Sequence, residues 1–383
     1  MNLFGRSQES LESHGGLFTA REIAQQPSVW NAIARNGGSE SAALAGFLAP
    51  LLAREELRVM LTGAGTSAFI GQCLAPALKQ HTQRRVDAVA TTDLVSSPDA
   101  WLEPVPTLLV HFARSGNSPE SVAALLVAER GLTERHHLIV TCNQDGALCR
   151  EARRLANAHV VVLPPETNDR GFAMTSSFTG MLLAVALAFG VSSPELAASL
   201  GRWSEELLAA SLPLIESLAK SKFERVVYLG GQALAGLARE AALKLLELSD
   251  GKIVALHETP LGFRHGPKTI VNNKTLIVMF LGNNPYSRQY DEDLLKELRA
   301  DGIAARVLAL RTGDGPRHRD DVTLTGAERA SDLSLCFPYV VFAQTYALLQ
   351  SLELGVRPDT PNPQGIVHRV VQGVSIYPWM PSR

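Results

Sequence analysis

The chain has 383 residues, of which 46% are apolar and 19% charged, with a formal net charge of −2. This composition is typical of a well-packed globular protein and excludes intrinsic disorder, while the length predicts two domains. The balanced charge gives no indication of the basic surface that a nucleic-acid partner requires, so we expect none.

The cysteines and the apolar segments indicate the compartment. The four cysteines lack paired spacing and lie in apolar or helical surroundings, which predicts buried thiols in a reducing compartment: Cys73, Cys142, Cys149 and Cys336. The N-terminus carries no basic-then-apolar signal pattern. The longest apolar run, residues 181–189, is shorter than the roughly 20 residues that span a bilayer. We therefore expect a cytoplasmic protein without a membrane partner.

Residues 1–54 show helical patterns but no residues that point to chemistry. The stretch from Thr19 to Glu22 resembles a capping box, and residues 40–52 carry an apolar stripe. A helix-turn-helix reader of DNA would need a basic recognition helix, and the sequence of this segment has none.

A strand is predicted at 58–62, followed by Gly63-Ala64-Gly65-Thr66-Ser67 and an apolar helix to about residue 79. A dinucleotide fold would require the spacing G-x-G-x-x-G, but the next glycine, Gly71, comes too late for the third position. Thr66 and Ser67 at the entrance of the helix suit a monophosphate better than a pyrophosphate.

The same arrangement recurs further along the chain. A buried strand is predicted at 107–112 and a helix at 121–130, and the loop between them contains Ser115, Gly116, Asn117 and Ser118. A helix start offers unpaired N–H groups and the positive end of a dipole, so hydroxyls beside it form a phosphate seat. The alternative is an ordinary capping loop, because Ser and Asn are favoured caps.

Further strands are predicted at 86–90, 137–141 and 159–163, alternating with helices or loops. This alternation predicts a parallel sheet covered on both faces, with ligands at the carboxyl ends of its strands. The hydroxyl-rich loop 166–177 contains Arg170, a strong cation that could face a phosphate or a sugar hydroxyl. A surface salt bridge is the alternative for Arg170.

The chain then repeats itself. Residues 58–63 are echoed by 225–230, an offset of 167, and residues 107–110 by 275–278, an offset of 168. Similarity at a period of domain size indicates a duplication. In the second copy, Gly282-Asn283-Asn284-Pro285 replaces the serine-rich loop, so the hydroxyl-rich seats lie in the first copy. Its strands are predicted at 225–229, 252–256, 275–281 and 304–310.

These patterns predict five parts of the chain. They are an N-terminal helical segment (1–54), a first domain with the predicted phosphate seats (55–195), a helical linker (196–218), a second domain (219–355) and a C-terminal tail (356–383).

The second copy supplies ionisable groups. Glu240, Lys244 and Glu247 lie on one predicted helix, where positions 244 and 247 are neighbours. Most charged helix residues are solvated surface, but leucines surround Glu247, and a carboxylate in apolar surroundings has a raised proton affinity that suits a general base. His265, followed by Gly-Pro, is predicted on an ordered loop, where a structural role is the alternative. We expect no metal site and no serine hydrolase, because H-E-x-x-H and G-x-S-x-G are absent from the sequence.

Taken together, four motifs resemble the sugar isomerase (SIS) family: GAGTS (63–67), RSGNSPES (114–121), REAALKLLELSDGK (239–252) and FRHGPK (263–268). The chain resembles the isomerase half of glucosamine-6-phosphate synthase. It is more similar to the tagatose-6-phosphate ketose/aldose isomerases, also described as galactosamine-6-phosphate deaminases, through residues 167–180 and 362–379. The resemblance implies an α/β fold of two tandem SIS domains, each a flavodoxin-like parallel sheet between helices.

The resemblance also implies residue roles. Glu247 matches the base that moves a proton between C1 and C2 of the open-chain sugar, and Lys244 matches a lysine beside it. His265 matches the histidine that opens the pyranose ring, which in the related synthase comes from the neighbouring subunit. The implied substrate and phosphate contacts are Gly65, Thr66, Ser67, Arg114, Ser115, Gly116, Asn117, Ser118, Arg170 and His368.

The resemblance implies that the second domain (219–355) carries the catalytic groups and that the C-terminal tail (356–383) closes over the site. The tail, however, departs from the synthase pattern. Gln372, preceded by His368 and Arg369, stands where the synthase has a lysine able to form a Schiff base, so a covalent imine is not expected. The glutaminase cysteine is absent after Met1 and Asn2, so ammonia transfer from glutamine is not expected either.

The resulting hypothesis is a homo-oligomeric enzyme, a dimer or a dimer of dimers, that needs no cofactor or metal. It would convert galactosamine 6-phosphate to tagatose 6-phosphate and ammonia. Two alternatives stay open: an isomerase of a non-amino sugar phosphate, and a regulator that binds a sugar phosphate without turnover.

Overall fold

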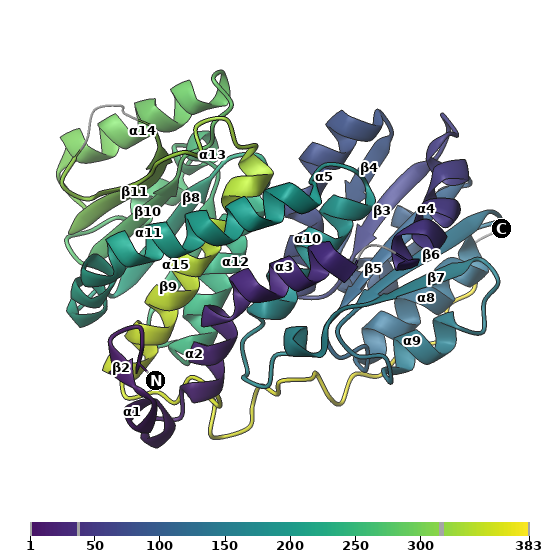
Figure 1. Ribbon diagram of the computed structural model, residues 1–383, viewed down its shortest axis with the longest axis horizontal. Helices are drawn as coiled ribbons and strands as arrows, with labels where there is room; N and C mark the ends of the chain where they lie inside the picture. The colour runs from purple at the N-terminus through teal and green to yellow at the C-terminus, as the bar shows by residue number, and fades with distance from the viewer. Residues whose placement is uncertain (1, 37–38, 314–317, 382–383) are drawn as a thin grey trace. The chain divides into compact units, whose positions relative to one another are not determined.

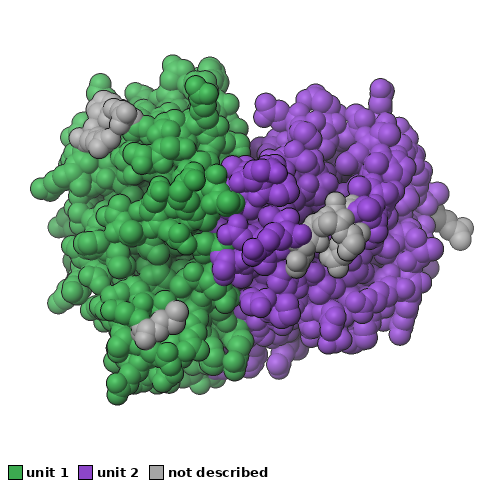
Figure 2. Space-filling model, viewed as in Figure 1, with its two compact units in different colours: residues 1–27, 170–175, 198–364 green, residues 28–169, 176–197, 365–383 purple. Residues whose placement is uncertain are grey.

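The computed structural model describes residues 2–36, 39–313 and 318–381 and divides into two compact units (Figure 2). Unit 1 comprises residues 1–27, 170–175 and 198–364, and unit 2 comprises residues 28–169, 176–197 and 365–383. Each unit is organised around one five-stranded sheet (Figure 1).

The sheet of unit 2 is parallel, with strand order β4-β3-β5-β6-β7. Its central strands are apolar and fully buried, as expected for a parallel sheet covered on both faces. The strands are β3 (Arg58–Thr62), β4 (Arg85–Ala88), β5 (Thr107–Ala113), β6 (Arg135–Thr141) and β7 (Ala158–Val162).

Helices cover both faces of this sheet. Met60 and Leu109 pack in one core cluster with residues of α6 (Thr91–Ser96) and α8 (Pro119–Gly131). Leu61, which points to the opposite face, contacts Gly71 of α5. The other elements of this unit are α3 (Gln26–Asn36), α4 (Ser39–Leu52), α5 (Thr66–Thr82), α7 (Pro98–Trp101), α9 (Ala147–Ala152), η1 (Pro165–Thr167) and α10 (Ser176–Ala188).

The sheet of unit 1 has the order β9-β8-β10-β11-β12 and is also parallel. When the strands are numbered within each five-stranded sheet, both sheets read 2-1-3-4-5, the flavodoxin-like order. The strands are β8 (Arg225–Gly230), β9 (Val254–Glu258), β10 (Thr275–Phe280), β11 (Arg306–Thr312) and β12 (Asp321–Leu324). The predicted fold of two tandem SIS-type domains is confirmed.

The register shows the duplication directly. Arg58 of β3 lies opposite Thr107 of β5, and the equivalent Arg225 of β8 lies opposite Thr275 of β10. The remaining elements of unit 1 are a hairpin of β1 (Asn2–Leu3) and β2 (Arg6–Ser7), with α1 (Gln8–Ser13), α2 (Leu17–Ala24), α12 (Ala233–Leu248), α13 (Pro260–Phe263), η2 (Pro267–Ile270), α14 (Ser287–Asp301) and α15 (Asp332–Glu353). The division between the units falls within α11 (Pro194–Lys220).

Helix α15 is the core helix of unit 1. It is the one helix in the described part of the chain long and apolar enough to cross a membrane, but 94% of its apolar window is buried inside the protein. It packs along α12, and its Tyr339 stacks on Phe280 of β10 at 5.9 Å. Such burial is typical of a core helix.

The predicted capping box at Thr19 is wrong. Helix α2 begins at Leu17, and the carboxylate of Asp359 accepts hydrogen bonds from the N–H and hydroxyl of Thr19 at 2.8 and 2.7 Å. Glu22 does not reach back to Thr19; it accepts hydrogen bonds from the N–H groups of Arg170 and Gly171. Thr19 and Glu22 thus make hydrogen bonds with residues distant in sequence and not with each other's turn, as the capping-box pattern predicted.

Candidate functional site

The two serine-rich loops follow neighbouring strands. Thr62 near the end of β3 lies opposite His111 near the end of β5, so the loops 63–67 and 114–118 leave the same edge of the sheet. The strand order reverses between β3 and β5, which is the point where parallel α/β sheets bind their ligands. Both predicted phosphate seats therefore lie at the expected place in unit 2.

In the first loop, the backbone at Gly63 lies very close to Ser67 at the start of α5. A Cβ on Gly63 would lie 2.6 Å from Ser67, so only glycine fits there, and Gly65 adopts φ +56° just before α5. Thr66 and Ser67 occupy the first turn of α5 and are both 4% exposed. The hydroxyls are thus held at the positive end of this helix.

The second loop is fixed by the segment that follows β6. Asn143 donates its amide N–H to the carbonyl of Ser115 at 2.9 Å, and the side chain of Asn117 accepts from the N–H of Ala147 at 2.9 Å. A Cβ on Gly146 would lie 2.5 Å from the Ser115 carbonyl oxygen, so glycine is required there too. Neither Asn143 nor Gly146 was predicted, although both follow a predicted strand at its carboxyl end.

The capping alternative for this loop fails at Ser118. This residue is the N-cap of α8, but its side chain makes no capping hydrogen bond. Its hydroxyl instead lies 2.6 Å from the hydroxyl of Ser121, and the Ser115 hydroxyl accepts from the N–H of Asn117 at 3.2 Å. The hydroxyls of Ser115 and Ser118 therefore form a polar lining at the start of α8, as a phosphate seat requires.

The predicted cations fall into different units. Arg114 lies directly after β5, is 7% exposed, and donates to the carbonyl of Arg369 at 2.7 Å. His368, beside it in the tail, is exposed. Arg170 belongs to unit 1, where its guanidinium lies 4.2 Å above the ring centre of Phe18. Its role in binding phosphate stays a prediction.

Three ionisable residues of α12 form a largely buried ion cluster. Glu240 and Lys244 are 0% and 1% exposed, and Lys244 Nζ lies 3.6 Å from Glu240 Oε1. The same ammonium also pairs with Glu247 Oε2, whose side chain is 23% exposed. The solvated-surface alternative is therefore wrong for Glu240 and Lys244. Glu247 is the member of the cluster that solvent or a substrate can reach.

His265 and Glu247 are not brought together within unit 1. His265 is exposed and follows α13, whose Phe263 packs with Val227 and with leucines of α14 on one face of the sheet. Tyr228, the next residue of β8, points to the opposite face and stacks on Phe280, which stacks on α15. Helix α12, which carries Glu247, packs along α15, so α12 and α13 lie on opposite faces of the sheet (Figure 1).

In the second copy, carboxylates occupy the position that is equivalent to the predicted phosphate seat of the first copy. Asp332, the first residue of α15, accepts from the N–H of Asn283 at 2.5 Å, and its Oδ2 would lie 2.6 Å from a Cβ on Gly282. Asp291 is 5% exposed, and burial together with nearby Asp332 raises its pKa to about 6. Two acidic side chains at this edge oppose a phosphate, in agreement with a seat in the first copy only.

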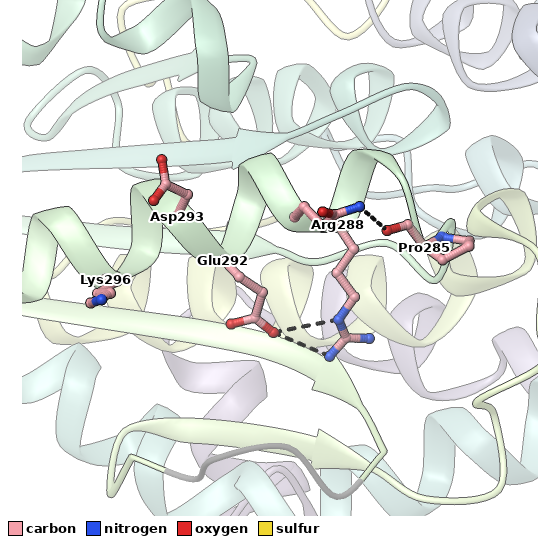
Figure 3. A pocket seen from close by; sticks show the side chains of 6 residues that line it. Pro285, Arg288, Glu292, Asp293 and Lys296 are labelled. Atoms are coloured by element: carbon pink, nitrogen blue, oxygen red, sulfur yellow. Dashed lines mark hydrogen bonds and ion pairs between the residues drawn. The ribbon is translucent and has the colours of Figure 1, made fainter.

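Two pockets lie apart from the predicted residues. One of about 570 Å³ runs along α14 in unit 1, where the side chains of Arg288 and Glu292 pair at 3.4 Å (Figure 3). The other, of about 1240 Å³, lies in unit 2 beyond the ends of β6 and β7. Asn143 lines this second pocket and also bonds the serine loop. In the described ranges, no group of three His, Cys, Asp or Glu residues could hold a metal ion.

Comparison with known proteins gives a consistent result. The SIS domain matches residues 51–190. A D-galactosamine-6-phosphate deaminase AgaS of Escherichia coli O157:H7 is 46% identical, covering 95% of this chain and 96% of the relative. The D-galactosamine-6-phosphate deaminase AgaS of Shewanella sp. (strain ANA-3) is 42% identical, covering 98% and 95%. The crystal structure of tagatose-6-phosphate ketose/aldose isomerase from Escherichia coli superposes with a TM-score of 0.88 at 43% identity, covering 95% and 97%.

Proposed function

This chain belongs to the SIS domain family, and on that premise we propose that it is an enzyme that converts galactosamine 6-phosphate to tagatose 6-phosphate and ammonia. The observation that carries the proposal is the similarity to deaminases over nearly the whole chain, at 42% and 46% identity. The serine-rich seat in unit 2 and the buried ion cluster in unit 1 supply the residue types that this reaction needs.

In the proposed reaction, the serine loops bind the 6-phosphate and His265 assists opening of the pyranose ring. Glu247 then removes the proton from C2 of the aldehyde and returns a proton to C1, which moves the unsaturation to the C2–N bond. Water adds at C2 and the nitrogen leaves as ammonia once it has been protonated, which gives the ketose. Binding energy from the phosphate, remote from C1 and C2, positions the sugar for these steps.

We also propose that the enzyme is cytoplasmic and acts as a homo-oligomer, a dimer or a dimer of dimers. The position of His265 supports the oligomer, because α13, which His265 follows, and α12, which carries Glu247, lie on opposite faces of the sheet of unit 1. A second copy of the chain can bring its own His265 to the sugar held by the first. Mixing Glu247→Gln and His265→Ala chains tests this, since only an oligomer that shares sites regains activity.

The test of the function is the Glu247→Gln variant, assayed for release of both ammonia and ketose. Loss of the base predicts a fall in kcat of about 10²- to 10⁴-fold. Glu224→Gln is the matched control, because Glu224 pairs with Lys274 on the exposed surface. Wild-type turnover in Glu247→Gln contradicts the assignment of the base.

A second candidate is isomerisation of a non-amino sugar phosphate, favoured by the similar Escherichia coli structure described as a tagatose-6-phosphate ketose/aldose isomerase. The two activities differ in one product. A panel of hexose and hexosamine 6-phosphates, assayed for ammonia and for ketose, separates them: ketose without ammonia favours the isomerase.

A further inference from the structure

A row of hydrogen bonds runs through the core of unit 2, between α8 and the sheet. The carboxylate of Glu129, on α8, accepts from Arg135 Nε at 3.0 Å and lies 3.0 Å from His137 Nε2. The other ring nitrogen of His137, Nδ1, lies 3.0 Å from Nε2 of His111. His137 and His111 are 0% and 1% exposed. The row therefore leads from the start of β6 to a buried histidine near the carboxyl end of β5.

The charge of Glu129 fixes where each proton of this row lies. The hydrogen bond from Arg135 lowers the pKa of Glu129 to about 2, so the carboxylate only accepts and His137 Nε2 must carry a hydrogen. Burial lowers the pKa of His137 to about 4, so its ring is neutral at pH 7 and its Nδ1 accepts from His111 Nε2. Burial and the neighbouring His137 hold the pKa of His111 well below its usual value. The remaining nitrogen of His111, Nδ1, is therefore an acceptor that needs a donor.

His111 Nδ1 is one of three buried polar atoms at this end of the sheet that have no hydrogen-bond partner among the described residues. The other two are the hydroxyl oxygens of Thr62 and Thr91. The side chains of Thr62, Thr91 and His111 are 0%, 2% and 1% exposed. Buried polar groups in folded proteins nearly always have a partner, and where the chain supplies none an ordered water commonly does.

Thr62 and His111 face each other across two neighbouring strands. They are in register on β3 and β5. Met60 and Leu109, two residues earlier on the same strands, pack in one core cluster with α6 and α8, so the side chains of Thr62 and His111 point to that same face. Neighbouring strands lie about 4.8 Å apart, a separation that one water spans with two hydrogen bonds of about 2.8 Å.

Thr91 brings a second hydroxyl to the same end of β3. It is the first residue of α6, and its N–H donates at 2.8 Å to the carbonyl of Gly63, the residue after Thr62. Helix α6 covers the same face of the sheet, because its Leu94 packs with Met60. A buried water typically makes about three hydrogen bonds, and three polar atoms here need a partner.

We propose that one buried water molecule is bound between the carboxyl ends of β3 and β5, where it donates to His111 Nδ1 and hydrogen-bonds the hydroxyls of Thr62 and Thr91. Water satisfies all three, because His111 needs a donor whereas a hydroxyl donates or accepts. The bound water joins the ends of the two strands that lead into the loops 63–67 and 114–118. This inference concerns the scaffold of these loops and depends on no step of the proposed reaction.

Crystal structures of wild type, Thr62→Val and Thr62→Ser, at a resolution that shows ordered water, test the site. Valine has nearly the shape of threonine without its hydroxyl, whereas serine keeps the hydroxyl. In wild type and Thr62→Ser we expect a water within hydrogen-bond distance of His111 Nδ1 and of the hydroxyl at position 62, and in Thr62→Val we expect this water to be lost. A direct hydrogen bond between Thr62 and His111, or a water that remains in Thr62→Val, overturns the assignment.

The order of donors and acceptors is tested in solution. In ¹⁵N NMR of histidine-labelled wild type at pH 7, we expect His111 to carry its hydrogen on Nε2 and none on Nδ1; the spectrum of His111→Asn identifies its signals. A hydrogen on Nδ1 overturns the proposed order, since the water would then have no acceptor to donate to.

Hydrogen exchange tests whether the water joins the two strands. Residues 59–68 and 109–118 should exchange faster in Thr62→Val than in wild type and Thr62→Ser. Residues 225–230, in the sheet of unit 1, should exchange equally in all three proteins and serve as the internal control. Equal exchange of residues 59–68 and 109–118 in the three proteins overturns the claim that the water holds these strands together.

Discussion

Lys244 provides the sharpest test of the buried ion cluster. Its ammonium, 1% exposed, lies between Glu240, which is 0% exposed, and Glu247. Lys244→Met keeps the volume and shape of the side chain but leaves two carboxylates of α12 without their shared cation. Removing one partner of a buried ion pair typically costs about 3–5 kcal/mol, because the remaining charge loses a counter-ion at a site that water does not reach.

The measurement is the free energy of unfolding at pH 7 from urea denaturation. Lys274→Met is the matched control, since Lys274 pairs with Glu224 where both side chains are more than half exposed, and such surface pairs contribute at most about 1 kcal/mol. The double variant Glu240→Gln/Lys244→Met removes the stranded charge, so it should regain most of the loss. A loss below about 1 kcal/mol in Lys244→Met, or a double variant as unstable as the single, would refute the reasoning.

Two further predictions concern unit 2. His137 is buried, and burial lowers its pKa to about 4 despite its hydrogen bond to Glu129. Above pH 6.5 it is neutral in both states, but between pH 6.5 and 4 only the unfolded chain binds the proton, so stability should fall by about 3 kcal/mol at 1.36 kcal/mol per pH unit. His137→Gln should flatten this part of the stability curve in urea titrations; an unchanged slope would exclude His137 as its source. The buried carboxylate of Asp169 accepts hydrogen bonds from the N–H groups of Ser176 and Ser177 at the start of α10, at 3.0 and 2.9 Å. Asp169→Asn weakens this cap and should cost about 1–2 kcal/mol in thermal unfolding, whereas an unchanged midpoint would show that the cap is unimportant.

Hydrophobic patterning predicted most of the sheet architecture, and its failures have local causes. β9 begins two residues later than expected, because Asp250 and Gly251 adopt positive φ values of 50° and 71° in the turn that ends α12. β12 was missed since Asp321 and Thr323 interrupt its apolar pattern. The Asp321 carboxylate is 1% exposed in the structure, where it pairs with Arg299 and Arg311. The four residues of β12 alone do not indicate that a charged side chain is buried there, because the residues that pair with it lie elsewhere in the sequence.

The candidate site shows the same limit. The motifs predict roles for the serine loops, Glu247 and His265, and these roles stay predictions. The sequence left the burial of Glu240 and Lys244 undecided, because a charged face on a helix is usually solvated. Their burial depends on packing within unit 1 that includes α15, which begins almost 90 residues later. Arg369 was noted only as a neighbour of His368, since its partner Asp169 lies 200 residues away.

Asp332 shows how little is needed for two halves of a duplicated protein to diverge. One inward carboxylate at the edge of the second sheet supplies, from within the chain, the negative charge that we propose a bound phosphate supplies at the first sheet. In this way, a ligand site in one copy of a duplicated domain can be replaced by hydrogen bonds within the chain. The protein then retains two equivalent scaffolds, of which only the first is proposed to bind a ligand at this edge.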